Sequence, residues 1–355
     1  MADTHRSIVE ATRAYEAWLR RQTRVVEADL RKKHKKMRKD PFVFLRATFY
    51  RWLEVWFSVG GGLVDAPRVL AVGDVHLENF GTWRDAEGRL VWGINDIDDA
   101  CELAYTQDLV RLATSVELSG LDLWLRTACG TILDGYRASL ERGGRPIVLA
   151  ERYAWLRDIA LAQVADPGQF WTELGDSLVP GGRPPRDLLT VALPAGACDV
   201  TFAQRTAGVG SLGRKRFVAT ALAGGSAVAR EAKALAPSAM SWLTGTRERP
   251  RLRPRLLARA VRVPDPFQAF EADWIVRRLA PDCRKIEVGQ FPRRSDHERF
   301  LRAMGWEVAN VHLATAKPRA ILRDLDERPK RWLEDAVGRM MKTVEKDWRA
   351  WTAQG

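Results

Sequence analysis

The sequence has few of the residues that build disulfide frameworks or metal clusters. Its 355 residues include only four cysteines and five histidines. The cysteines are scattered and form no C-x-x-C pair, so we expect reduced thiols and no structural zinc site. A two-metal phosphoesterase, which Gly-Asp-Val-His at residues 73–76 would suggest, needs more clustered histidines and carboxylates. The residues concerned are Cys101, Cys129, Cys198 and Cys283, and His5, His34, His76, His297 and His312.

The chain also lacks a long apolar segment. It contains no run of about 18 apolar residues that would span a bilayer, and its first residues contain no hydrophobic leader segment. We therefore expect a cytoplasmic protein without a membrane span. With 46% hydrophobic residues, the chain can bury one large core or build two lobes around a cleft.

Positive charge is abundant and unevenly distributed. The net charge is +12, and residues 20–39 carry ten Lys or Arg against Glu27 and Asp29, a local net charge of +8. A solvated basic helix face is the simplest interpretation of this segment. A nucleic-acid partner and an anionic membrane surface are the less favoured alternatives. A second arginine-rich stretch at residues 247–262 adds to the nucleic-acid interpretation.

The hydrophobic pattern predicts an α+β protein with a helical part and a β-rich part. Apolar residues recur at helical spacing in residues 7–39, 42–57, 105–140, 297–316 and 328–351. Short strands are predicted at residues 68–72, 90–94, 202–207, 216–222, 227–232 and 274–279.

These patterns divide the chain into four regions. We assign a basic amphipathic helical segment to residues 1–40, a helical large lobe to 41–185, a small β-rich lobe to 186–290, and helices returning to the large lobe to 291–355.

The first candidate site is the loop at residues 73–81, directly after the predicted strand 68–72. In the catalytic loop of kinases, an Asp accepts the proton of the substrate hydroxyl and an Asn five residues later holds magnesium. Asp74 and Asn79 have this spacing. We therefore predict Asp74 as the catalytic residue, Asn79 as a metal ligand and His76 as hydrogen-bonding support of the loop.

Carboxylates follow the next predicted strand, in Asn-Asp-Ile-Asp-Asp at residues 95–99. Magnesium prefers oxygen ligands and is usually held by one or two carboxylates together with substrate phosphates. Asp96 stands where kinases place their second magnesium ligand, and Asp98 is a further candidate. Taken singly, an acid in such a turn is more often a cap. Asp108 is either an ordinary acid of a first helical turn or, as in kinase-like folds, the tether of the catalytic-loop backbone.

A glycine-rich sequence, Gly-Val-Gly-Ser-Leu-Gly at residues 208–213, lies between two predicted strands. A dinucleotide-binding loop would be followed by a helix instead. Between strands, such a loop is typical of the kinase small lobe, where backbone amides approach phosphate oxygens without interference from Cβ atoms. We predict that Gly208, Gly210, Ser211 and Gly213 bind nucleotide, with a plain hairpin as the alternative.

Together these motifs resemble the bacterial domain of unknown function 2252. The similarity runs from about Lys36 to Ala316 and is carried by residues 42–46, 73–81, 95–98, 108–113 and 208–213. That family is grouped with kinase-like and aminoglycoside-phosphotransferase-like proteins and has no assigned activity. The resemblance therefore implies a two-lobed, protein-kinase-like fold.

Two features depart from kinases. The glycine-rich loop follows Asp74 instead of preceding it, so a kinase-like fold would be circularly permuted, which is tolerable when the termini lie close together. Family relatives carry Lys-Glu-Ala after the glycine-rich hairpin, where this chain has Arg-Glu-Ala at residues 230–232. We expect Arg230 to face the cleft as a phosphate clamp and Lys233 to point away from it.

The sequence thus favours a phosphotransferase that uses ATP and Mg²⁺ on an unknown small-molecule or protein acceptor, with nucleotidyl transfer as a variant. Because Arg230 replaces the lysine, a catalytically degenerate pseudokinase or scaffold that binds nucleotide is the alternative. A nucleic-acid-binding protein and a metallophosphoesterase are less favoured.

Overall fold

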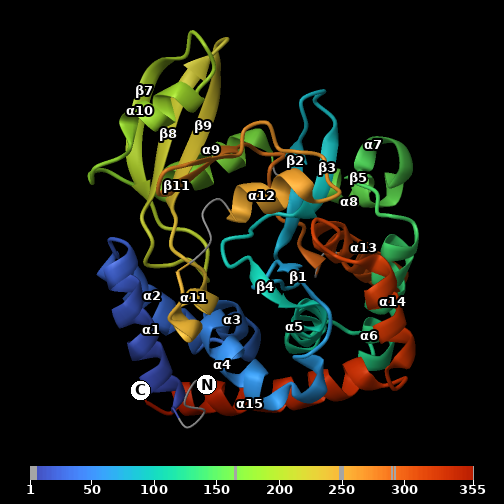
Figure 1. Ribbon diagram of the computed structural model, residues 1–355. Helices are drawn as coiled ribbons and strands as arrows, with labels where there is room; N and C mark the ends of the chain where they lie inside the picture. The colour runs from blue at the N-terminus through green and yellow to red at the C-terminus, as the bar shows by residue number, and fades with distance from the viewer. Residues whose placement is uncertain (1–5, 164–165, 248–251, 289–290, 292, 355) are drawn as a thin grey trace.

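A small antiparallel sheet lies above a larger, mostly helical body, and the candidate loops lie between them (Figure 1). The structure is a computed structural model that describes residues 6–163, 166–247, 252–288, 291 and 293–354. His5 and part of the arginine-rich stretch at residues 247–262 lie outside the described residues. The α+β class and the small antiparallel sheet agree with the prediction. No described helix is long and apolar enough to cross a membrane.

The small lobe is a six-stranded sheet in the order β10-β11-β9-β8-β7-β6, in which neighbouring strands are antiparallel. Different helices cover its two faces. Leu189 of α10 packs with Phe217 on one face, and Leu174 of α9 packs with Val218 on the other. The elements are α9 (Pro167–Asp176), β6 (Leu178–Val179), α10 (Arg186–Ala192), β7 (Cys198–Arg205), β8 (Arg216–Ala223), β9 (Ser226–Ala234), β10 (Ala269–Glu271) and β11 (Trp274–Leu279).

The N-terminal region consists of two helices, so the prediction of one helix over residues 7–39 is wrong. Helix α1 (Ile8–Gln22) ends before an extended connection, and α2 (Glu27–Met37) follows it. Val26 N donates a 2.8 Å hydrogen bond to Gly213 O, and Val25 forms a β-bridge with Arg214. The β-branched residues of the connection favour this extended backbone, and pairing with the glycine-rich loop fixes it.

Two further helical predictions are each split into a pair of helices. Residues 42–57 form α3 (Pro41–Ala47) and α4 (Phe49–Val59), which meet at Thr48. Residues 105–140 form α5 (Tyr105–Leu118) and α6 (Leu125–Glu141). The second break includes Gly120, whose positive φ of 72° favours glycine. Helical period alone does not reveal such breaks, because the apolar pattern continues through them.

Two strand pairs carry the candidate loops of the helical body. β1 (Arg68–Ala71) pairs with β4 (Cys101–Ala104), and β2 (Phe80–Arg84) pairs with β3 (Leu90–Ile94). The loop at residues 72–79 therefore joins β1 to β2, and the loop at residues 95–100 joins β3 to β4. Both loops cross between the same two strand pairs, which brings them side by side. Asn95 N donates a 2.9 Å hydrogen bond to Asn79 O at this point.

The remaining elements complete the helical body, and the order of segments along the chain does not follow the two lobes. α9 and β6 precede residue 186 but pack with the small sheet. α11 follows the sheet, and its Trp242 packs back on Tyr15 and Tyr50 of the body. The elements are a short 3-10 helix (Gly61–Leu63), β5 (Ile147–Val148), α7 (Leu149–Arg152), α8 (Ala154–Ala162), α11 (Ala239–Thr244), α12 (Leu252–Arg259), α13 (Arg294–His312), α14 (Pro318–Glu327) and α15 (Trp332–Thr352).

The two ends of the described chain lie close together (Figure 1). α15 contacts α1, and Trp351 Nε1 donates a 3.3 Å hydrogen bond to His34 O. This proximity meets the geometric condition for a permuted order of elements.

Helices α6 and α13 cross at two glycines. A Cβ atom at Gly135 would overlap Arg302 O, and one at Gly305 would overlap Ile132 O. The helix backbones touch directly at this crossing, which holds α13 against the core.

We predict that Gly135→Ala lowers the free energy of unfolding by about 1–3 kcal/mol or more, because the backbones must separate. Gly130→Ala in the same helix is the matched control, since a Cβ there meets no described atom within 4 Å. It should be neutral or stabilising by roughly 0.5–1 kcal/mol. Chemical denaturation of both variants measures the difference, and equal effects would contradict the close crossing.

Candidate functional site

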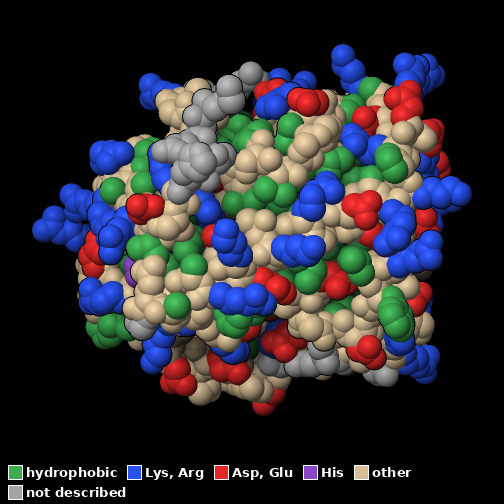
Figure 2. All heavy atoms as spheres, turned by 90° about the horizontal axis from the view of Figure 1, so that it is seen from below, with side chains coloured by type: hydrophobic (Ala, Val, Ile, Leu, Met, Phe, Trp, Pro, Cys, Tyr) green, Lys and Arg blue, Asp and Glu red, His purple; other side chains and the backbone are tan. Residues whose placement is uncertain are grey.

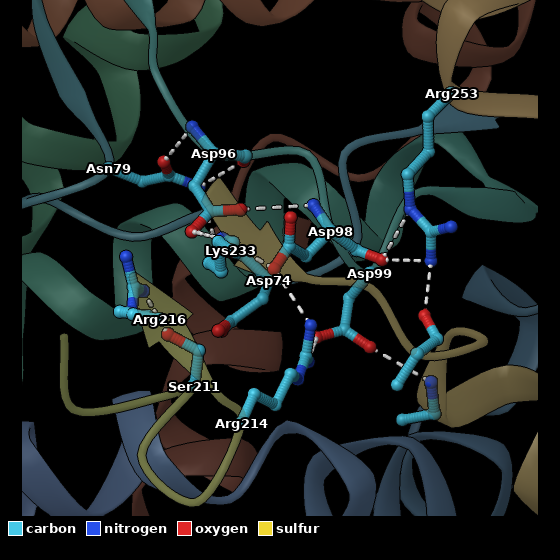
Figure 3. Close-up of polar contacts among 12 residues, drawn as sticks. Asp74, Asn79, Asp96, Asp98, Asp99, Ser211, Arg214, Arg216, Lys233 and Arg253 are labelled. Atoms are coloured by element: carbon cyan, nitrogen blue, oxygen red, sulfur yellow. Dashed lines mark hydrogen bonds and ion pairs between the residues drawn. The ribbon is translucent and has the colours of Figure 1, made fainter. Parts of the chain in front are cut away.

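A cavity of about 250 Å³ lies where the small sheet meets the helical body. The loops at residues 72–79 and 95–100 line it from the body, and the glycine-rich loop lines it from the small lobe. The side chains that converge there are seen in Figure 3. Its charged lining comprises Asp74, Asp96, Asp98 and Asp99, together with Arg46, Arg205, Arg214, Arg216, Arg277 and Lys285.

Asp74 follows β1 and is held by Arg111 of α5. Arg111 Nε donates a 3.0 Å hydrogen bond to Asp74 Oδ1, and its Nη2 donates to the same oxygen and to Leu45 O. The Arg111 guanidinium is completely buried against the rings of Phe49 and Trp52, each 4.9 Å away. Burial raises the pKa of Asp74 from 3.8 to about 7, although Arg111 acts to lower it. Asp74 therefore titrates near neutral pH.

Asp108 anchors the backbone that presents Asp74. Its Oδ2 accepts a 2.7 Å hydrogen bond from Val72 N, and its Oδ1 accepts a 3.1 Å bond from Gly73 N. His312 Nε2 lies 2.9 Å from Asp108 Oδ2, and Tyr136 Oη lies 2.8 Å from His312 Nδ1. A neutral imidazole with its proton on Nε2 satisfies both contacts. These contacts fix the backbone of the two residues that precede Asp74.

Asn79 ties the two loops of the body together. Its Nδ2 donates to Asp74 O at 3.1 Å and to Asp96 O at 2.9 Å, and its Oδ1 accepts from Asp96 N at 2.9 Å. The Asn79 side chain therefore links the backbones of the two loops, and its Oδ1 retains one lone pair for a further partner.

His76 lies within the same loop. Its Nδ1 accepts a 3.2 Å hydrogen bond from Glu78 N, and its ring packs edge-on against Phe42. Burial, together with the nearby positive charge of Arg46, holds the pKa of His76 well below its ordinary value. The neutral ring thus packs within the loop and accepts a hydrogen bond from its backbone.

Lys233 of β9 joins the small lobe to the acidic loop. Its Nζ lies 3.0 Å from Asp96 Oδ2 and 2.5 Å from Asp98 Oδ2. Arg214 Nη1 donates a 2.8 Å bond to the same oxygen of Asp98. Asp98 is thus enclosed with 7% of its side chain exposed, whereas 40% of the Asp96 side chain remains exposed. Burial acts to raise the pKa of Asp96, but the Lys233 ammonium outweighs it and holds the pKa well below the ordinary value.

The expected orientation of β9 is wrong. Arg230 Nε donates to Ala192 O at the end of α10, and its guanidinium lies over the Phe267 ring. Arg230 therefore faces away from the cavity, while Glu231 and Lys233 alternate to the opposite face. The alternation of side chains along β9 correctly placed Arg230 and Ala232 on one face and Glu231 and Lys233 on the other. The packing of α10 decides that the face with Arg230 is turned away from the cavity.

A buried carboxylate organises the cations above the cavity. Glu231 is fully buried and accepts hydrogen bonds from Arg205 at 2.9 Å, Arg216 at 2.8 Å and Arg277 at 2.8 Å. Burial acts to raise the pKa of Glu231, but the three guanidiniums more than offset it, so the pKa is strongly lowered. Three cations share one carboxylate, which leaves a surplus of positive charge beside the glycine-rich loop.

The glycine-rich loop approaches Asp74 closely. A Cβ atom at Gly210 would lie 3.0 Å from Arg46 O and 3.4 Å from Asp74 Oδ2. Gly208 has a φ of +74°, and a Cβ there would lie 2.9 Å from the Arg216 guanidinium. Ser211 Oγ accepts a hydrogen bond from that guanidinium, and Gly213 packs against Leu30 of α2. A larger side chain at Gly208 or Gly210 would thus enter the cavity wall.

Several residues of this site were missed in the sequence. Arg111 lies one helical turn after Asp108. This spacing indicates that the two side chains share a helix face, but it does not reveal that Arg111 pairs with Asp74. Arg214, Arg216 and Arg277 belong to no motif in the sequence, and only the fold brings them to Asp98 and Glu231.

The raised pKa of Asp74 predicts a specific pH dependence of stability. In the unfolded chain its pKa returns to roughly 3.9, so between about pH 4 and pH 7 only the folded protein retains the proton. The free energy of unfolding should therefore fall as pH rises from 5 to 7, by about 2 kcal/mol more than in Asp74→Asn. Denaturation curves across this range measure the difference, and parallel profiles would contradict the assignment.

Comparison with known proteins relates part of the chain to a described family. A family model described as an uncharacterized protein conserved in bacteria (DUF2252) matches residues 21–167, and no curated protein or solved structure matches the chain. The matched segment includes Asp74, Asn79, Asp96 and Arg111 and ends before the glycine-rich loop. Similarity to this bacterial family therefore covers the part of the chain that builds the lower wall of the cavity.

Proposed function

We propose that the protein is a kinase-like phosphotransferase with a circularly permuted, two-lobed fold, which transfers the terminal phosphoryl group of ATP to an acceptor hydroxyl. One observation carries the proposal. Asp74, Asp96 and the glycine-rich loop, which are far apart in the sequence, line a single cavity between the two lobes. Kinases combine the same three parts, a catalytic Asp, a metal-binding Asp and a glycine-rich loop that covers the phosphates.

Cations in this cavity suit a triphosphate. Arg46, Arg205, Arg214, Arg216, Arg277 and Lys285 outnumber its four aspartates. We assign the phosphate-binding lysine to Lys233 in place of Arg230, because its ammonium lies beside Asp96 on the cavity side of β9. Guanidinium groups bind phosphate oxygens in a bidentate manner, which adds to the fit.

The carboxylates fit a magnesium ion that is bound jointly with phosphates. Among the described residues, no group of three or more His, Cys, Asp or Glu forms a metal cage by itself. Magnesium commonly takes one or two protein carboxylates and completes its shell with phosphates and water. Asp96, with its exposed carboxylate, and the remaining lone pair of Asn79 Oδ1 would hold it. The ion would neutralise the negative charge on the phosphate oxygens.

Asp74 has the properties of a general base. Arg111 contacts Oδ1 alone, while Oδ2 is directed towards Gly210 at the cavity wall. A base with a pKa of about 7 is well matched to neutral pH. Asp74 Oδ2 takes the acceptor proton while the acceptor oxygen bonds to the terminal phosphorus. The bond from that phosphorus to the bridging oxygen breaks, and ADP leaves.

A nucleotide-binding protein without turnover is the alternative. It is favoured by the direct ion pair between Lys233 and Asp96, since the ammonium already neutralises the carboxylate that we assign to the metal. The two functions differ in turnover and share nucleotide binding.

Calorimetry of ATP binding with Mg²⁺ tests the assignment of Lys233. Lys233→Met should weaken the affinity by about tenfold or more, because a charged phosphate contact is lost. Arg230→Met is the matched control on the same strand and should stay within about threefold of the wild type. A larger loss in Arg230→Met than in Lys233→Met would contradict the observed orientation of β9.

Two carboxylate variants separate binding from chemistry. Asp74→Asn should retain ATP affinity and lose about 100-fold or more in turnover, because the base is removed. Asp96→Ala should lose the magnesium dependence of ATP binding. Phosphate release, with water as acceptor, and calorimetry measure both. Turnover of Asp74→Asn within about tenfold of the wild type would rule out the catalytic role, and ATP binding with no measurable turnover in the wild type would favour the alternative.

A further inference from the structure

The end of α1, the α1–α2 connection and the outer face of α2 are strongly basic. Arg21 is exposed in the last turn of α1, Arg24 is exposed on the connection, and Arg31, Lys35 and Lys36 are exposed on α2. The inner face of α2 is buried through Leu30 and Met37. Lys and Arg side chains crowd the left edge of the molecule in Figure 2, the side on which α1 and α2 lie in Figure 1.

Most of these charges have no internal counter-ion. Arg20 pairs with Glu27, and Lys32 lies 3.8 Å from Asp29. Among the described residues, Arg24, Arg31, Lys35 and Lys36 form no ion pair. Arg31 and Lys35, like Lys32 and Lys36, stand four residues apart on the helix, where like charges destabilise it by a few tenths of a kcal/mol per pair. The repulsion between these charges destabilises α2 in the isolated chain, and an anionic partner would relieve it.

A hollow of about 790 Å³ adjoins this surface. Arg21 lines it from the end of α1, Arg24 from the connection, Arg183 from the loop before α10, and Lys215 from the residues just after the glycine-rich loop. Trp274 of β11 and the two acids Glu27 and Asp273 also line it. Cations from three separate parts of the chain therefore extend the basic face of α2 into a recess with an aromatic wall.

The length and polarity of the surface select among anionic partners. The 11 residues of α2 rise about 16 Å, which is longer than one phosphate group spans. Large exposed apolar side chains occur at other described positions, such as Phe57 and Trp124, and α1 and α2 carry none. Helices that bind membranes bury an apolar face in the bilayer, so a membrane is disfavoured. Linear arrays of cations beside an aromatic residue suit single-stranded nucleic acid.

We propose that α2, the α1–α2 connection and the adjoining hollow bind a single-stranded nucleic acid through its phosphates. This binding does not depend on the proposed phosphotransferase activity. The bound strand lies next to the glycine-rich loop, because Val26 N bonds to Gly213 O and Thr206 Oγ1 donates to Asp29 Oδ1 at 3.1 Å.

Fluorescence anisotropy of the full chain with a labelled single-stranded oligonucleotide tests the proposal. Affinity should fall steeply with salt, because bound cations release the counter-ions of the strand. Lys35→Glu combined with Lys36→Glu should weaken binding by about tenfold or more at low salt and reduce the salt dependence. Lys317→Glu with Lys330→Glu, the same charge change at the start of α14 and in the connection between α14 and α15, should stay within about threefold.

Three outcomes would overturn the proposal. These are no binding by the wild type, equal weakening by both variant pairs, and binding to phosphatidylserine vesicles without binding to the oligonucleotide. Lys35→Gln with Lys36→Gln repeats the test if the glutamate pair fails to fold, since it removes the cations without adding repulsion. Unchanged binding by this milder pair would also overturn the proposal.

Discussion

A buried chain of polar contacts positions the candidate catalytic loop, and the rest of the site depends on it. It runs from Tyr136 on α6 through His312 on α13 to Asp108 on α5 and ends at the amides of Val72 and Gly73. Asp108 and His312 are fully buried, so each donor and acceptor that loses its partner here costs free energy with no compensation from water. Three helices thereby fix the backbone from which Asp74 projects, and the close glycine crossing of α6 and α13 keeps the chain of contacts in register.

The second constraint is electrostatic. Three arginines surround Glu231, and Lys233 pairs with two aspartates. Removing these charges from water costs free energy, and an apolar core of the same volume would often be as stable. The arrangement holds charged groups at fixed positions beside the cavity that Asp74 also lines. Such fixed charges attract phosphate oxygens without further reorganisation when a ligand enters. Binding of phosphates would explain why the protein bears this desolvation cost, which folding alone does not require.

Local sequence patterns singled out some residues of the cavity, and tertiary packing determines the others. The spacing of a strand, a loop and a hairpin pointed to Asp74, Asn79 and Asp96, which line one cavity, and to Asp108, which lies behind it and holds the loop. The orientation of Arg230 and Lys233 could not be predicted, because alternation along β9 is the same whichever face α10 covers. The break between α1 and α2 depends on pairing of Val25 and Val26 with the distant glycine-rich loop. The four longer strands of the small sheet, β7, β8, β9 and β11, were located to within a few residues, whereas the short edge strands β6 and β10 were missed.

The proposed function requires a triphosphate to bridge the glycine-rich loop and Asp96 within the cavity between the lobes. A crystal structure of the protein with a non-hydrolysable ATP analogue and Mg²⁺ would show whether it does. We expect to find the phosphates beneath residues 208–213, the metal on Asp96, and the terminal phosphate facing Asp74. An analogue bound in the basic hollow beside α2, or anywhere that leaves Asp96 paired only with Lys233, would contradict it.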